Sequence, residues 1–111
     1  GNMFGILPSY GFYLRHVKNI SLLDLDISLK SEDMRYAILA DDVDGLVLSG
    51  IKADLSHDAE PFLKLNESGN VMIESIVSKS GTGTLITNNN NPNIKIRENS
   101  IMGFQKIYGD E

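Results

Sequence analysis

The chain has 111 residues, of which 41% are hydrophobic, and a formal net charge of −5. This length fits one small domain spanning residues 1–111. The acidic balance, without a stripe of Lys and Arg, argues against a dedicated nucleic-acid binder. No apolar stretch is long enough to span a bilayer, so membrane insertion is not expected. The absence of Cys removes disulfides and thiolate metal sites together.

One short pattern occurs four times along the chain. Each copy has an apolar run, a polar turn that ends in Asn or Gly, and a second apolar run. The first residues after the four turns are Ile20, Leu46, Val71 and Ile94, so successive copies lie 26, 25 and 23 residues apart (46−20, 71−46, 94−71). A period of this size indicates a solenoid in which one repeat forms one coil.

A second series supports the same period. Leu25, Ile51 and Ile76 each lie five residues after the start of their run and begin a third short run. Asn99 takes that position in the fourth copy, so we expect the last coil to depart from the pattern. Three runs per repeat predict three strands per coil, with alternating inward and outward side chains. Parallel pairing between successive coils, about 4.8 Å apart, would place the apolar series in ladders inside the solenoid.

The turns fit this geometry. Asn19, Gly45, Asn70 and Asn93 occupy one register, and Asn and Gly are the residues that best tolerate a left-handed backbone. A tight corner between two strands needs that conformation. Stacked Asn side chains could also form hydrogen bonds from coil to coil.

The segment around residues 31–40 is compatible with two structures. An acidic start followed by apolar residues three to four positions apart fits a capped helix, whereas alternation through Tyr36, Ile38 and Ala40 fits a strand. We predict a strand from Tyr36 onward. Polar clusters at 56–61, 80–83 and 88–92 are predicted to be loops between runs.

The resulting fold prediction is an all-β parallel β-helix of about four coils. A leucine-rich repeat has a similar period and is the structural alternative, but its Leu-x-x-Leu-x-Leu-x-x-Asn core is not kept here. A solenoid of this length has two open ends, and the sequence shows no amphipathic N-terminal cap. We therefore expect either an end-to-end homo-oligomer or a missing N-terminal region.

Three segments resemble a known family. They are Leu-Pro-Ser-Tyr-Gly-Phe-Tyr-Leu-Arg-His-Val-Lys-Asn-Ile at 7–20, Glu-Asp-Met-Arg-Tyr-Ala-Ile at 32–38 and Asp-Asp-Val-Asp-Gly-Leu at 41–46. Together they resemble the C-terminal part of bacterial proteins related to family 28 glycoside hydrolases, which are polygalacturonase-like members of the pectin lyase-like superfamily. The resemblance implies a right-handed β-helix and a longer parent protein. That parent would be periplasmic or extracellular and act on a pectin-like polysaccharide.

The family's catalytic segments are missing from this chain. It contains no Asn-Thr-Asp, no Gly-His-Gly and no Arg-Ile-Lys. Ala40-Asp41-Asp42 is similar to the central acidic pair, but it leads into the turn Val43-Asp44-Gly45, and no Gly-His-Gly follows. Family 28 hydrolysis is an inverting reaction that depends on paired carboxylates, and that set cannot be carried over. We expect this chain alone to be inactive, with the active site of any parent enzyme on other coils.

The period also brings charged residues together. Asp41 and Asp42 lie one coil beyond Arg15 and His16 (15+26=41, 16+26=42), at about one strand spacing. This group could bind sugar hydroxyls or polarise a water molecule. It could equally be a surface salt-bridge ladder between coils, and such ion pairs usually contribute about 0–1 kcal/mol each. His57, beside Asp58 in a loop, is expected to be solvated rather than to act as a base.

Two classes of function remain. In the first, the chain is the C-terminal β-helical portion of a secreted glycoside hydrolase that acts on pectin-like polysaccharide. In the second, it is a non-catalytic carbohydrate-binding or adhesin-like β-solenoid module. Both predict a polysaccharide or oligosaccharide partner. No cofactor is predicted, and no metal site, because the acidic clusters lack the Asp-x-Asp-x-Asp-Gly loop of a calcium site.

Overall fold

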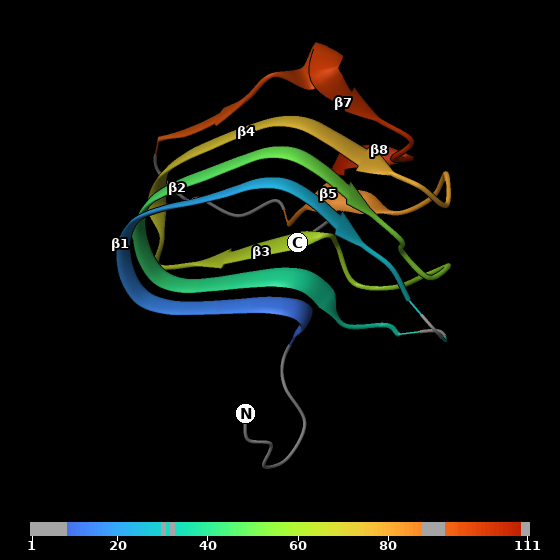
Figure 1. Cartoon of the computed structure of the whole chain (residues 1–111), viewed down its shortest axis with the longest axis horizontal. Helices are drawn as coiled ribbons and strands as arrows, with labels where there is room; N and C mark the ends of the chain where they lie inside the picture. Colours follow the sequence, from blue (N-terminus) through green and yellow to red (C-terminus); the bar gives the residue numbers. More distant parts are fainter. Residues whose placement is uncertain (1–8, 30, 32, 88–92, 110–111) are drawn as a thin grey trace.

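A computed structural model describes residues 9–29, 31, 33–87 and 93–109 of the chain. They form a right-handed parallel β-helix of about four coils, which confirms the predicted fold (Figure 1). Eight strands share one parallel sheet that wraps around the solenoid. They are β1 (Ser9–Ile27), β2 (Tyr36–Ala53), β3 (Leu63–Asn66), β4 (Gly69–Ser78), β5 (Thr84–Ile86), β6 (Ile94–Ile96), β7 (Ile101–Met102) and β8 (Lys106–Tyr108). A 3-10 helix, η1 (Glu98–Ser100), precedes β7.

The first apolar series forms the predicted ladder. Ile20 pairs with Leu46, Leu46 with Val71, and Val71 with Ile94. The two inner members are fully or almost fully buried, whereas the two end members are only half-buried because each has a neighbouring coil on one side. The core is therefore a stack of aliphatic layers whose packing weakens toward both ends of the solenoid.

The second series pairs as predicted in the first three coils, and the fourth coil departs from the pattern, as expected. Leu25, Ile51 and Ile76 pair as predicted, but the next member is Ile101 and not Asn99. The cause is a two-residue insertion. Ile73 and Ile76 are three residues apart, whereas their partners Ile96 and Ile101 are five apart. The additional residues form η1, a single tight turn that bulges outward so that the inward position can still be filled by an aliphatic side chain.

The predicted left-handed corners are confirmed at all four positions. Asn19, Gly45, Asn70 and Asn93 have φ values of 55°, 90°, 55° and 57°. Two further series of corners, not predicted from the sequence, have the same backbone conformation. They are His16, Asp42 and Glu67, and Asp24, Gly50 and Ser75.

The corners also change the number of strands per coil. A single left-handed residue turns the chain without ending the ladder, so the three predicted runs of each of the first two coils join into one bent strand, β1 or β2. Each coil has three sides, as predicted, but the expected three separate strands are not formed there.

Gly45 shows how closely the corners stack. A Cβ atom at this position would lie 2.5 Å from the Asn19 side-chain oxygen and 3.2 Å from the Asn19 nitrogen. Gly45 therefore interrupts the expected column of Asn side chains. Asn70 instead donates a hydrogen bond from Nδ2 to Oδ1 of Asp44, at 2.6 Å.

The ambiguous segment is resolved in favour of the strand, because β2 begins at Tyr36 and the described residues before it are not helical. The predicted loops at 56–61 and 80–83 are confirmed, since neither range contains a strand. The predicted loop at 88–92 lies outside the described residues.

Hydroxyl groups continue the hydrogen-bond ladder where the corners interrupt it. The Val43 amide donates to Ser68 Oγ at 3.0 Å, and the Leu55 amide donates to Ser80 Oγ at 3.1 Å. The Ser75 amide donates to Ser100 Oγ at 2.9 Å. Donor and acceptor are 25 residues apart in each pair, so each serine satisfies a backbone group of the preceding coil that a turn would otherwise leave without a partner.

Candidate functional site

The structure brings the four predicted site residues together in two pairs. Arg15 lies directly beside Asp41 in the β1–β2 register, with Arg15 Nε 3.6 Å from Asp41 Oδ2. His16 and Asp42 both occupy the left-handed corner, and His16 Nδ1 lies 2.7 Å from Asp42 Oδ2. The repeat period thus predicted both neighbours correctly.

The next coil adds a residue that the sequence analysis missed. Asn66 at the end of β3 pairs with Asp41, and its Nδ2 donates to Asp41 Oδ1 at 3.3 Å. One further period, 41+25=66, would have located it. We call these five residues the corner cluster: Arg15, His16, Asp41, Asp42 and Asn66.

The corner cluster is held by backbone pairing and open to water. The side chains of Arg15, His16 and Asp42 are 58%, 61% and 63% exposed, and that of Asp41 is 24% exposed. Exposed ion pairs of this kind contribute about 0–1 kcal/mol each. The separation of 3.6 Å between Arg15 and Asp41 is too long for a hydrogen bond, so the guanidinium retains donors for an anionic or hydroxylated ligand.

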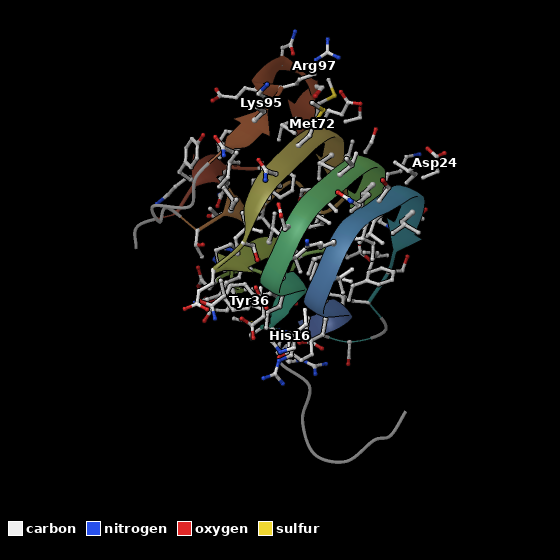
Figure 2. The ribbon with its side chains drawn as sticks, turned by 90° about the vertical axis from the view of Figure 1, so that its left-hand side faces the viewer. His16, Asp24, Tyr36, Met72, Lys95 and Arg97 are labelled. Carbon is white, nitrogen blue, oxygen red and sulfur yellow. The ribbon has the colours of Figure 1, made fainter. Side chains whose placement is uncertain are left out.

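A shallow depression of about 390 Å³ lies farther along the same side of the solenoid. Its walls are Asn70, Val71, Met72, Asn93 and Lys95. In Figure 2, Met72 and Lys95 lie near Arg97 at the top of the view, while His16 lies at the bottom. The depression therefore offers amide groups, an ammonium group and an apolar sulfur side chain at the opposite end of this side from the corner cluster.

A second depression, of about 240 Å³, is lined by Asp24, Leu25, Asp26, Gly50 and Lys52. Lys79 bonds Asp26 from two coils away and also donates to Ser28 Oγ at 2.9 Å. The hydrogen bond from Lys79 holds the pKa of Asp26 below its ordinary value. Among the residues that the structure describes, no group of three or more His, Asp or Glu side chains is arranged to hold a metal ion.

His57 is solvated, as expected. Its Nε2 lies 3.5 Å from Asp58 Oδ2 in the loop before Phe62, and both side chains are more than three-quarters exposed. No described contact orients it toward another acid or nucleophile, so this pair is not a candidate catalytic site.

A partly buried ion pair in the loop before β2, between Asp33 and Arg35, provides a test of electrostatic stabilisation. Asp33 accepts bonds from Arg35 at the backbone amide (3.0 Å), Nε (2.9 Å) and one terminal nitrogen (2.6 Å), and these bonds lower the pKa of Asp33. Because the folded-state pKa is depressed, the stabilisation is present above the ordinary value of 3.8 and is lost as the pH falls through the folded-state value.

We therefore expect Asp33→Asn to destabilise the protein at neutral pH by about 0.2–1 kcal/mol, and by less at pH values below the ordinary pKa of Asp. Urea unfolding of both proteins at neutral and acidic pH measures the difference. If Asp33→Asn changed the free energy of unfolding by the same amount at neutral and acidic pH, the ionised Asp33 carboxylate would not be the source of the stabilisation.

The fold defines the class of the protein, a parallel β-helix with a charged corner cluster. Comparison with family models, with curated proteins and with solved structures finds no match for this chain. In the described part of the chain, no helix combines the length and apolar character that crossing a membrane requires.

Proposed function

We propose that this chain is a non-catalytic, polysaccharide-binding part of a secreted glycoside hydrolase-like protein that acts on pectin-like polymers. The observation that carries the proposal is the corner cluster, in which a guanidinium, an imidazole, two carboxylates and an amide lie side by side on adjacent coils. The resemblance of residues 7–20, 32–38 and 41–46 to family 28 hydrolases supplies the expected substrate class and the expected periplasmic or extracellular location.

The chemistry of the corner cluster suits an acidic sugar. A pectin-like chain carries a carboxylate and several hydroxyl groups on each residue. Arg15 can form charge-assisted hydrogen bonds with a carboxylate, while Asp41 and Asn66 offer acceptors and donors for hydroxyl groups. Backbone pairing fixes the spacing of these residues before a ligand arrives, which lowers the entropic cost of binding.

Hydrolysis by this cluster is not supported. A general acid in a glycosidase needs a raised pKa, usually from an apolar pocket, and its partner must leave room for water. Asp41 instead has Arg15 beside one oxygen and accepts from Asn66 at the other, and Asp42 is bonded to His16 in solvent. Neither carboxylate lies in the apolar pocket that a general acid requires, so the cluster suits binding rather than hydrolysis.

The test is titration of the isotope-labelled chain with oligogalacturonides, followed by NMR, alongside a neutral oligosaccharide of equal length. We expect shifts centred on the corner cluster with the acidic sugar only. Arg15→Ala should weaken binding about tenfold, since a hydrogen bond to a charged group contributes about 1.5–3 kcal/mol and exposure reduces that value. Lys52→Ala, which removes an exposed cation from another side of the coil, is the matched control.

Three results would count against the proposal. Shifts scattered over the surface, or equal weakening by Arg15→Ala and Lys52→Ala, would indicate non-specific attraction of an anion. Release of reducing ends from polygalacturonate by the isolated chain would show that it is an enzyme in its own right. Binding without specificity for an acidic sugar would favour the alternative of a general adhesin-like module.

A further inference from the structure

The larger of the two surface depressions is not used by the proposed function. It holds about 390 Å³ and is lined by Asn70, Val71, Met72, Asn93 and Lys95. Because Met72 pairs with Lys95 in the register, the depression spans the ladder between β4 and β6 (Figure 1). Its volume is at the lower end of the usual range for small-molecule sites, which suits one small ligand.

Lys95 brings a positive charge that the chain itself does not neutralise. Its side chain is exposed, and no carboxylate of the described residues forms an ion pair with it. Glu74, two positions after Met72 on β4, is already occupied at both oxygens. One accepts from Arg97 at 3.3 Å and the other from Ser49 at 3.2 Å. In a protein of net charge −5, this ammonium group is therefore available to an anionic ligand.

Two amide side chains lie at the same corner. Asn70 and Asn93 are equivalent left-handed residues of successive coils, and the Val71 amide donates to the Asn93 carbonyl at 3.0 Å. Asn70 uses its Nδ2 group on Asp44, which leaves its side-chain oxygen as an acceptor. The Asn93 side chain is exposed and has no hydrogen bond to another described residue. The corner thus offers donors and acceptors to the hydroxyl groups of a ligand.

Met72 adds an apolar wall to the depression. It is 39% exposed and lies between Val47 and Lys95 in an outward column. A thioether side chain is flexible and packs well against irregular apolar surfaces. Figure 2 shows Met72 and Lys95 near each other and far from His16, so the depression is separate from the corner cluster.

We propose that this depression binds a single sugar acid. The carboxylate of the ligand contacts Lys95, and its hydroxyl groups contact Asn70 and Asn93. The CH face of the sugar ring packs against Met72. A neutral sugar would leave Lys95 without a partner, and a simple carboxylate would leave both amides unused. The site does not include the corner cluster, so this inference does not depend on polysaccharide binding there.

The charges present favour a carboxylate over a phosphate. An ammonium group is a compact single charge, whereas a guanidinium can bind a phosphate through two parallel hydrogen bonds. The guanidinium at this end of the solenoid belongs to Arg97, which is already in an ion pair with Glu74. One free ammonium therefore matches the single charge of a sugar acid.

Titration of the isotope-labelled chain, followed by NMR, tests the site. The ligands are glucuronate and galacturonate, their neutral counterparts glucose and galactose, and acetate and inorganic phosphate. The Met72 methyl and the Asn93 side-chain amide should shift saturably with a sugar acid, with a Kd on the order of 1 mM for so open a site. The neutral sugars and acetate should bind at least about tenfold more weakly, because each lacks part of the recognised chemistry.

Variants of the charged and amide groups test the assignment. Lys95→Gln should weaken binding at least about tenfold, whereas Lys95→Arg, which keeps the charge, should stay within about threefold. Asn93→Gly keeps the left-handed backbone but removes the amide, and should weaken binding about threefold. Lys52→Gln removes an exposed cation from the other depression and should leave binding unchanged. Circular dichroism confirms that each variant is folded.

Three results would overturn the proposal. They are the absence of saturable shifts at concentrations well above the expected Kd, equal weakening by Lys95→Gln and Lys52→Gln, and phosphate binding as tight as that of a sugar acid. The last would identify a general anion site. Arg15→Ala should not change the Met72 shift, so a failure of the corner cluster to bind polysaccharide is read separately from a failure of this site.

Discussion

Replacing Leu46 with alanine is expected to lower the free energy of unfolding by about 3–5 kcal/mol, toward the upper part of the range for buried leucines. Leu46 is completely buried and is clamped between Ile20 and Val71 in the aliphatic ladder. Backbone pairing on both sides prevents the neighbouring coils from collapsing into the space left by the lost methyl groups. Since small domains are stable by only about 5–15 kcal/mol, this one substitution should bring the chain close to unfolding.

The measurement is urea denaturation followed by circular dichroism, with Met72→Ala as the control. Met72 points outward from the next coil and is 39% exposed, so its truncation should change stability by no more than about 0.5 kcal/mol. The loss of stability for Ile94→Ala, at the half-buried end of the same ladder, should lie between the losses for Leu46→Ala and Met72→Ala. Equal losses at the three positions would contradict a core that is tightest in the middle coils.

The sequence predicted the ladder because a solenoid repeats the same environment at a fixed interval. Every inner coil needs an aliphatic side chain at the position of Leu46 and a residue that tolerates positive φ at the position of Asn70. Both residue types therefore recur in the sequence at the repeat interval. The neighbours Arg15 and Asp41 were predictable for the same reason.

The features that the sequence did not predict are the inserted residues of the fourth coil and the bending of the long strands. Asn99 fits the period as well as Ile101 does if only residue numbers are counted, and burial decides between them. Apolar alternation also does not reveal that one left-handed residue can bend a strand without ending it. The strands β1 and β2 therefore appear as three runs in the sequence and as one strand each in space.

The corner cluster was predicted in part for a related reason. Its two ion pairs follow from a spacing of 26 residues between β1 and β2. The position of Asn66 follows from the next spacing of 25 residues, although this residue ends a much shorter strand whose run gives a weaker signal. The depression beside Asn70 and Asn93 has no sequence signature, because its shape results from the side chains of two adjacent coils that pack around a corner.

A second large loss of stability is expected from a substitution at a left-handed turn. We expect Gly103→Ala to destabilise the protein by about 3 kcal/mol, because two costs add. Gly103 has φ of 84°, and a left-handed conformation costs an L residue about 1–2 kcal/mol. A Cβ atom at this position would also lie 2.3 Å from the Ser78 carbonyl oxygen, a backbone atom that can move only if the turn after β7 moves away from the coil below.

Gly81→Ala is the matched control for this experiment. Gly81 has a similar φ of 72°, but nothing lies within 4 Å of the Cβ atom that alanine would add. Its substitution should therefore cost only the conformational part, about 1–2 kcal/mol. The difference between the two variants in urea unfolding isolates the close approach of successive coils at the turn. If Gly103→Ala and Gly81→Ala lowered the free energy of unfolding by the same amount, the third and fourth coils would have to lie farther apart at this turn than stacked coils do.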